Sequence, residues 1–248
     1  CGSSEPGDSA IMKHMERVPH RLLPFAVLAA AACSGGLAPL PVPVGLAPAS
    51  LEEAAQWAAS TRPAENRELR FRVSFQDEQG SAGGRGRVRL ALPDSVRLDF
   101  VGALGSARAQ AFVTGDTSIW ADPEEDVRKL VPNYPLFWAM LGIARGPEPG
   151  SSVRKVVNGI ITAWQFVSVG DTVEYVREAG PAGRLIAEVR QNGKRIGRVE
   201  TKFGPDGLPV SSRLVVTERP AKLDLTFIQN QKAAAFAPDT WTRPAPPG

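Results

Sequence analysis

Apolar and polar residues alternate with a period of two along most of the chain after residue 68. In an extended strand this period places every second side chain on the same face. Strands of this kind pair in antiparallel sheets that have one apolar face and one solvated face. The alternation predicts strands at 69–75, 87–92, 96–100, 107–114, 116–121, 153–158, 160–168, 171–179, 184–191, 195–203, 208–217 and 221–229.

Short turn sequences separate these strands. Asn158-Gly159, Asn192-Gly193 and Asp206-Gly207 are dipeptides that favour the tight turns of β-hairpins. Gly80 to Gly86 and Pro93-Asp94 are expected to form further turns, because Gly and Pro interrupt regular structure. The strands are therefore expected to follow one another as consecutive hairpins.

Two segments depart from the alternation and predict helices. Residues 50–61 carry apolar positions at helical spacing, with Ser50 placed to cap the first turn and Glu53 in the matching position of a capping box. Residues 133–145 are apolar without alternation and are followed directly by a Gly-Pro pair that would end a helix.

These elements predict a mainly β fold: a curled antiparallel sheet of about eleven strands that forms an incomplete, half β-barrel with short helices as a lid. A long run of hairpins in one sheet curls instead of staying flat. The apolar inner face of such a sheet must be filled or covered, and a barrel too wide for its own side chains leaves a ligand cavity.

The first 32 residues are expected to lie outside the folded domain. Met12 is preceded by a polar stretch, which we interpret as upstream sequence. Basic residues after Met12 lead into the apolar run 22–32, which ends in small residues. This order is typical of a secretory signal peptide, and the run is too short to span a bilayer as a helix.

Cys33 follows the small residues Ala31 and Ala32, as in the bacterial lipoprotein signal, in which this Cys is acylated and becomes the new N-terminus. Acyl chains that bury methylene groups at about 0.8 kcal/mol each would anchor the protein to a membrane. The Pro-rich segment 33–49 is expected to be a solvated tether, and 50–243 the folded domain. A plain signal peptide with a chance Cys is the alternative.

The positions of His and Cys exclude most catalytic chemistry. Both His, His14 and His20, lie before Cys33, and the other Cys is Cys1. A chain cleaved before Cys33 would hold no His, which excludes Ser-His-Asp and Cys-His catalysis, His-ligated metals and disulfides. We therefore expect no catalytic residue, no metal and no cofactor. The net charge of +3 makes no case for nucleic acid as a partner.

Carboxylates leave one catalytic alternative. Glu188 and Glu200 lie on alternating strands, and a pair of acids is the basis of glycoside hydrolysis. Both are expected to face outwards beside Lys and Arg as cross-strand charge pairs, which disfavours an enzyme of this kind. The acidic group from Asp122 to Asp126 is expected to be an exposed turn.

The segment Gly102-Ala103-Leu104-Gly105 lies between two predicted strands and has two interpretations. The first is a hairpin tip that tucks Leu104 into the core. The second is an exposed apolar tip. A Leu in water at a turn adds no stability, so exposure would indicate contact with a membrane or a partner.

Here the sequence resembles a known family. Arg97-Leu98, followed by Gly102 to Ser106 and a strand, resembles the outer-membrane lipoprotein receptor of the bacterial lipoprotein-localisation (LolA/LolB-like) pathway. Pro135-Leu136 to Gly146-Pro147 is similar to the short central helix of that family, and Cys33 matches its acylated Cys. Leu104 falls on the protruding Leu of a Pro-Leu-Gly-Ser turn that the family uses to deliver lipoproteins, and Ala103 replaces the Pro.

The resemblance implies a membrane-anchored lipoprotein with no enzymatic activity that binds acyl chains in a half-barrel. It would receive lipoproteins from a periplasmic carrier and insert them into the outer membrane, where it would face the periplasm. Gly102, Ala103, Leu104 and Gly105 would form the membrane-insertion loop. The expected lining of the acyl cavity comprises apolar residues of the strands and of the central helix: Leu69, Phe71, Val73, Leu90, Leu98, Phe100, Trp120, Leu136, Trp138, Leu141 and Trp164.

A structural role is the alternative function. In that case the half-barrel is filled by its own side chains and acts as a protein-interaction platform in the cell envelope. The two functions differ in one observable: a filled half-barrel has no cavity large enough for an acyl chain.

Overall fold

The computed structural model describes residues 38–103, 108–124, 133–217 and 220–244. Contacts divide the chain into two units, residues 1–38 and residues 39–248. The second unit holds every helix and strand of the described residues.

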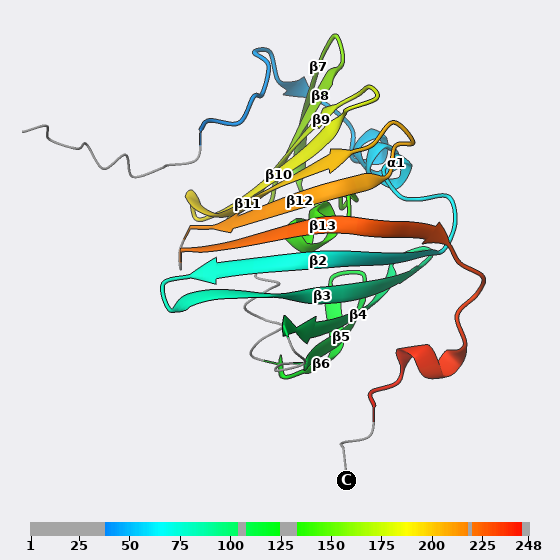
Figure 1. Cartoon of the computed structure of the whole chain (residues 1–248). Coiled ribbons are helices and arrows are strands. Elements are labelled where there is room, and N and C mark those ends of the chain that lie inside the picture. Colours follow the sequence, from blue (N-terminus) through cyan, green and yellow to red (C-terminus); the bar gives the residue numbers. More distant parts are fainter. Residues whose placement is uncertain (1–37, 104–107, 125–132, 218–219, 245–248) are drawn as a thin grey trace, which may run out of the picture. The chain divides into compact units, whose positions relative to one another are not determined.

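A single antiparallel sheet dominates the structure (Figure 1), and it contains thirteen strands among the described residues. Consecutive strands pair as hairpins, and two long strands near the centre, β13 and β2, join the two halves. In spatial order the strands are β1 (Ala47–Pro48), β7 (Ser152–Asn158), β8 (Ile161–Val167), β9 (Asp171–Glu178), β10 (Arg184–Gln191), β11 (Lys194–Phe203), β12 (Pro209–Val216), β13 (Ala221–Lys232), β2 (Arg67–Asp77), β3 (Gly80–Ala91), β4 (Ser95–Gly102), β5 (Arg108–Thr114) and β6 (Thr117–Asp122).

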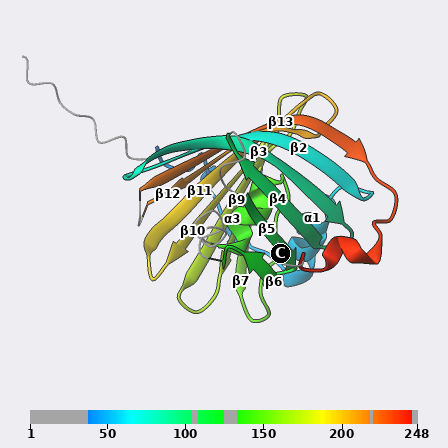
Figure 2. The same ribbon diagram turned by 60° about the horizontal axis from the view of Figure 1, so that its bottom comes forward.

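The predicted fold class is confirmed. The structure is mainly β, and its antiparallel sheet is curled and not closed into a barrel. The terminal strands of the order, β1 and β6, do not pair with each other, so the barrel is incomplete. Figure 2 shows that the sheet arches over the helices α1 (Leu51–Ser60) and α3 (Tyr134–Met140), which lie on its inner, concave side. A short 3-10 helix, η2 (Pro238–Trp241), follows the last strand.

The glycine-rich segment 80–86 is part of a strand, which contradicts the predicted hairpin loop. The turn lies earlier, where the Asp77 carboxylate accepts hydrogen bonds from the backbone of Gln79 and Gly80. On the concave face, a Cβ atom on Gly86 would lie 2.1 Å from the ring of Phe71, and one on Gly84 would lie 2.8 Å from that of Phe100. The glycines therefore make room for aromatic rings, a role that glycine plays inside strands.

The first helix forms where the sequence predicts it. The backbone N–H of Glu53 donates to Oγ of Ser50 at 3.0 Å, which satisfies one of the free donors at the helix N-terminus. The backbone N–H of Ala144, just after α3, donates to Oγ1 of Thr61 at the C-terminus of α1. The ends of the two helices are therefore tied together.

The second helix is shorter than predicted, because it ends at Met140 and not near residue 145. Gly142 adopts a positive φ of 81°, and its N–H donates to Ala139 O while that of Ile143 donates to Trp138 O. This pair of bonds is the Schellman arrangement, which glycine favours one residue past a helix end. Gly142 is therefore the stop signal, five residues before Pro147.

The convex face is not polar throughout. On the side of β8 to β10 it carries a small apolar cluster of Ala163, Val176 and Ile186, and Leu40 and Val42 pack against it. The described part of the predicted tether, residues 38–49, is therefore partly packed, although Val44 is fully exposed. Leu40 and Val42 are partly buried, and Ala47–Pro48 extends the sheet as β1.

Glu188 is the most deeply buried acid of the convex face, with no exposed side-chain surface. Its carboxylate lies 2.7 Å from Arg190, 2.9 Å from Arg195 and in ion-pair contact with Arg198. The expected cross-strand pairing is present, but the guanidinium groups cover the acid completely. Burial alone would raise the pKa of Glu188, whereas the hydrogen bonds and charges of Arg198 and Arg195 lower it, and the net pKa is below the ordinary value.

Glu188→Gln should lower the free energy of unfolding by about 3–5 kcal/mol at neutral pH, because it removes one partner of a buried ionic cluster. Urea denaturation measures this loss. Since the folded-state pKa lies below the unfolded one, the stabilisation is present above the unfolded pKa of about 4.3 and is lost as pH falls through the folded value. The wild type should show this acid-dependent loss, and the variant should show less of it.

Glu178→Gln is the matched control, because Glu178 pairs with Arg184 at a site that is 32% exposed. Exposed ion pairs contribute at most about 1 kcal/mol. Equal losses in the two variants would contradict the account of Glu188.

Candidate functional site

Helix α3 fills the concave face of the sheet. Its residues 136–140 are all buried, and the helix packs on β10, β11 and β12. Two polar groups fix its position: Nε1 of Trp138 donates to Gly115 O at 2.8 Å, and Oγ1 of Thr201 donates to Ala139 O at 2.7 Å. The helix therefore has specific contacts with the β5–β6 turn in one half of the sheet and with β11 in the other.

A small, wholly apolar cavity remains between α3 and the strands. Its volume is about 40 Å³, and its walls come from β2, β3, β4 and β13 on one side and from α3 and Leu141 on the other. One water molecule occupies about 30 Å³ in the liquid, so the cavity is far too small for an acyl chain. The lining residues are Phe71, Val73, Val88, Leu98, Phe100, Phe137, Met140, Leu141, Leu223 and Leu225.

The predicted lining residues divide between this cavity and the packed core. Phe71, Val73, Leu98, Phe100 and Leu141 line the cavity. The other concave-face residues lie in the same apolar cluster without lining it: Leu69, Leu90, Leu136, Trp138 and Trp164.

The cavity is also lined by five residues that were not predicted there: Val88, Phe137, Met140, Leu223 and Leu225. The sequence could have indicated three of these residues, because Val88, Leu223 and Leu225 occupy apolar positions of strands predicted by the alternation. For Phe137 and Met140 no signal was available, since an apolar helix does not show which side faces a cavity.

Trp120 lies on the opposite face, so its predicted place in the cavity is wrong. In the β5–β6 pairing it stands opposite Phe112, and an irregularity after Phe112 shifts the register. Nε1 of Trp120 donates to Trp241 O at 3.0 Å, and the guanidinium of Arg97 lies 5.4 Å from its ring. The segment around η2 covers Trp120 on the convex side, and no local pattern in the sequence announces that register shift.

Trp164 belongs to another region of the concave core, which packs against α1. The ring of Trp57 lies 5.5 Å from that of Trp164 and 5.6 Å from that of Tyr175. Burial raises the pKa of the Tyr175 hydroxyl, which accepts a hydrogen bond from the backbone N–H of Arg145. Trp164 therefore serves the packing of α1 in this structure.

A larger cleft of about 520 Å³ lies at the N-terminus of α3, between β5 and β6 on one side and β8 and β9 on the other. Volumes of 300–1,000 Å³ are typical of ligand sites. Its wall includes Phe166, Val173 and Tyr134, and acids such as Asp116 and Asp171 also line it. Arg145, in the same cleft, binds the Asp116 carboxylate through Nε at 3.0 Å.

The two cavities flank α3. Asn133, Tyr134 and Pro135 at its start line the larger cleft, while Met140 and Leu141 at its end line the apolar one. A displacement of α3 away from the sheet would therefore join the two spaces along the concave face.

Of the predicted membrane-insertion loop, residues 102–105, only the first two residues are described. Gly102 ends β4, and Ala103 follows as an exposed residue at the turn toward β5. Leu104, Gly105 and Cys33 lie outside the described residues.

The acids considered for catalysis do not form a convergent pair. Glu188 is enclosed by arginines, and Glu200 stands opposite Ile186 on the convex face, 3.7 Å from Arg184. Asp122 and Glu124 are exposed as expected, and the other acids of that group lie outside the described residues. Among the described residues, no group of three or more His, Cys, Asp or Glu side chains could hold a metal ion. In the same part of the chain, no helix has the length and apolar character needed to cross a membrane.

Comparison with known proteins identifies the fold. No family model and no curated protein matches the sequence. A LolA superfamily protein, NE2245 from Nitrosomonas europaea, matches with a TM-score of 0.51 and 10% identity over 79% of this chain and 98% of that chain. The chain has a LolA-like fold.

More distant likenesses have scores below 0.5 and add nothing on function. The MucA/MucB complex of Pseudomonas aeruginosa matches with a TM-score of 0.34 and 15% identity over 77% of this chain and 61% of that chain. A DUF1329 family protein from Desulfovibrio piger matches with a TM-score of 0.37 and 4% identity over 77% and 95%. The LolA-like fold thus agrees with the resemblance seen in the sequence, and at 10% identity it establishes architecture alone.

Gly142→Ala should destabilise the docking of α3. An Ala there would meet the strain of a positive φ, which costs about 1–2 kcal/mol, and its Cβ would lie 2.8 Å from the ring of Phe203. Gly150→Ala is the matched control, because Gly150 has a similar φ of 83° and no atom within 4 Å of the added Cβ. Urea denaturation should show the larger loss for Gly142→Ala, and an equal loss would mean that Phe203 yields freely.

Proposed function

We propose that the protein binds acyl chains of lipids or lipoproteins on the concave face of its sheet, in the place that α3 now occupies. The observation that carries this proposal is the wholly apolar cavity between α3 and β2–β4, which a displacement of α3 would join to the larger cleft. The LolA-like fold and the expected acylation of Cys33 support it. Transfer between a carrier, this protein and a membrane needs no catalytic group.

The energetics of an acyl chain fit this site. Each buried methylene contributes about 0.8 kcal/mol, so about ten methylenes supply about 8 kcal/mol, equal to a Kd near 1 µM. The free energy needed to displace α3 lowers this affinity. Acyl binding is therefore expected to be reversible, as a transfer protein requires.

The proposal extends to the expected location. The protein would be anchored by acylated Cys33 in the bacterial outer membrane and face the periplasm, where it would accept lipoproteins from a soluble carrier. The loop Gly102, Ala103, Leu104 and Gly105 would contact the membrane during delivery. Support comes from the hairpin itself, since β4 and β5 extend to the end of the sheet where Phe75 and Phe100 are only half-buried.

The second candidate is an envelope platform for protein partners. The small volume of the apolar cavity, about 40 Å³, favours it, because side chains and α3 already fill most of the concave face. Uptake of an acyl probe separates the two candidates.

Purified protein should take up a fluorescent fatty acyl probe with saturable fluorescence. Leu98→Glu should weaken the affinity at least tenfold, because the carboxylate would stand unpaired in an apolar wall. Ile160→Glu is the control, since Ile160 is 59% exposed in a turn far from the cavity walls. Circular dichroism confirms that each variant is folded, and absence of saturable uptake by the folded wild type would leave only the platform.

Leu104→Glu should leave probe binding intact and slow the delivery of a bound acyl probe to vesicles by about tenfold or more, since a charge opposes entry into the bilayer. Transfer to vesicles that hold an energy-transfer acceptor measures the rate. Ile160→Glu again serves as the control, because its turn lies at the opposite end of the sheet (Figure 1). Unchanged delivery by Leu104→Glu would remove the membrane role of the loop.

A further inference from the structure

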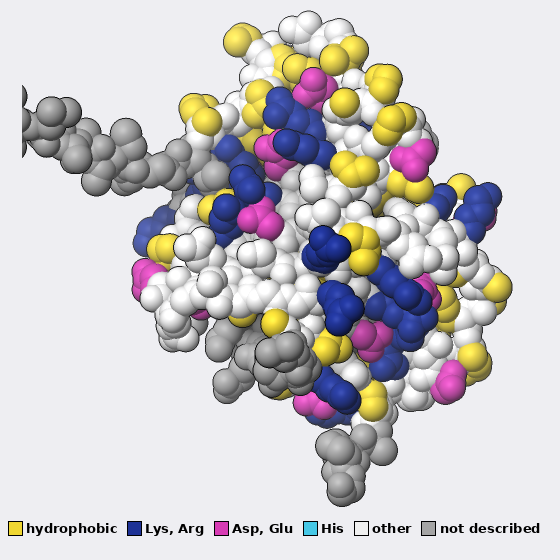
Figure 3. Space-filling model, in the orientation of Figure 1, with side chains coloured by type: hydrophobic (Ala, Val, Ile, Leu, Met, Phe, Trp, Pro, Cys, Tyr) yellow, Lys and Arg dark blue, Asp and Glu magenta, His cyan; other side chains and the backbone are white. Residues whose placement is uncertain are grey.

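The convex face of strands β2 to β5 carries far more cations than anions. Figure 3 shows Lys and Arg side chains gathered over this part of the sheet. The acids at the convex positions of these four strands are Glu68 and Asp99. The arginines at those positions are Arg70, Arg72, Arg85, Arg87, Arg89, Arg97 and Arg108.

The strand register places Arg directly opposite Arg at three points. Arg70 faces Arg87, and Arg72 faces Arg85 across β2 and β3. Arg89 faces Arg97 across β3 and β4. Like charges directly opposite each other destabilise a sheet, so each pair calls for an anion.

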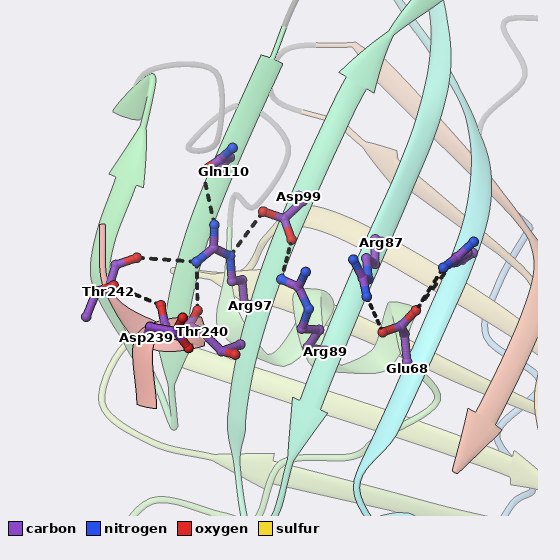
Figure 4. A network of polar contacts seen from close by, with 10 residues as sticks. Glu68, Arg87, Arg89, Arg97, Asp99, Gln110, Asp239, Thr240 and Thr242 are labelled. Carbon is purple, nitrogen blue, oxygen red and sulfur yellow. Dashed lines mark hydrogen bonds and ion pairs between the residues drawn. The ribbon is translucent and has the colours of Figure 1, made fainter. Parts of the chain in front are cut away.

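Two of the three pairs have their anion within the chain (Figure 4). Glu68 accepts hydrogen bonds from Arg70 at 3.3 Å and from Arg87 at 2.5 Å, and these contacts lower its pKa against the opposing effect of burial. Asp99 accepts from Arg89 at 2.8 Å and from Arg97 at 3.0 Å. A carboxylate thus bridges each of these pairs.

The third pair, Arg72 and Arg85, has no such bridge. Both side chains are exposed, and no acidic side chain among the described residues forms an ion pair with either. Arg72 and Arg85 belong to a row of residues that stand directly opposite one another across neighbouring strands. This arginine row consists of Thr226, Arg72, Arg85, Val101 and Arg108. From β13 to β5 this row therefore presents guanidinium and hydroxyl groups without a carboxylate.

The row lies next to the end of β4 and the start of β5. Val101, which stands between Arg85 and Arg108, directly precedes Gly102 at the end of β4. Its side chain is 43% exposed, so the row combines cations with an accessible apolar group. Both cavities described above open on the other face of the sheet, so the row is not part of their walls.

We propose that Arg72, Arg85 and Arg108 form a docking surface for the phosphate-bearing headgroups of an anionic membrane. A guanidinium group binds phosphate through two parallel hydrogen bonds, and phosphates at a lipid surface supply the anion that the third pair lacks. Val101 matches the apolar boundary beneath the headgroups. The inference rests on the proposed function, because it places the membrane at the end of the sheet where delivery would occur.

The test uses the full chain with Cys33→Ser, so that no acyl anchor contributes to binding. Its affinity is measured by co-sedimentation with vesicles of phosphatidylcholine and with vesicles that also contain phosphatidylglycerol. The anionic vesicles should bind the protein more tightly, and added salt should weaken the binding. Arg72→Gln/Arg85→Gln should weaken it roughly thirtyfold, since each Arg near an anionic surface contributes about 1 kcal/mol.

Arg154→Gln/Lys202→Gln is the charge-matched control. It removes two exposed cations from the convex face of β7 and β11, and its affinity for anionic vesicles should change little. An equal loss in both double variants would reduce the effect to net charge and overturn the proposal.

Two further readouts keep the outcomes distinct. If Arg72 and Arg85 only support the fold, their replacement should lower the melting temperature, whereas removal of a repulsive pair should leave it unchanged or raise it.

If anionic vesicles bind no better than neutral ones while the acyl probe still binds, the docking surface is overturned and the proposed function stands. The row would then be the place to seek an acidic protein partner.

Discussion

The whole structure depends on how one curled sheet covers its apolar inner face. A closed barrel or a second sheet would bury that face against strands, but here the edges β1 and β6 remain apart. The chain covers it with α3, whose buried side chains lie against β10, β11 and β12. Because α3 has only seven residues, its docking depends on specific hydrogen bonds from Trp138 and Thr201 as well as on apolar contact. A cover that consists of one short helix is compatible with exchange for another apolar group.

The alternation of the sequence was sufficient for the strands and for the inner face of the sheet, because a period of two leaves little choice of face once the core side is known. It failed where backbone geometry overrides the pattern. Gly84 and Gly86 suggest a loop, yet both lie in a strand. The strand has glycine at these positions because the rings of Phe71 and Phe100 occupy the space that a side chain would need. Trp120 changed faces through a register shift in the β5–β6 pairing, which depends on tertiary contacts with Trp241.

The convex face shows a second kind of constraint, in which charge and not apolar area decides the arrangement. Glu188 and Glu68 are each surrounded by arginines, and the guanidinium groups keep both acids charged despite burial. Elsewhere on this face the sheet tolerates repulsion between Arg72 and Arg85. A fold selected for stability alone would replace one of them, and the described residues supply no carboxylate between them, so the repulsion is explained by an anion that binds from outside.

The two faces together give the proposed transfer a direction. Acyl chains would occupy the concave face only while α3 is displaced, and the return of α3 to its contacts with Thr201 and Gly115 O would favour their release. Release into water is unfavourable by about 0.8 kcal/mol per methylene, whereas release into a bilayer carries no such cost. An anionic membrane held against the arginine row would lie near the β4–β5 turn at the moment of release. The return of α3 would then displace the acyl chain from the concave face. The arginine row on the convex face would hold the protein at the membrane that receives this acyl chain.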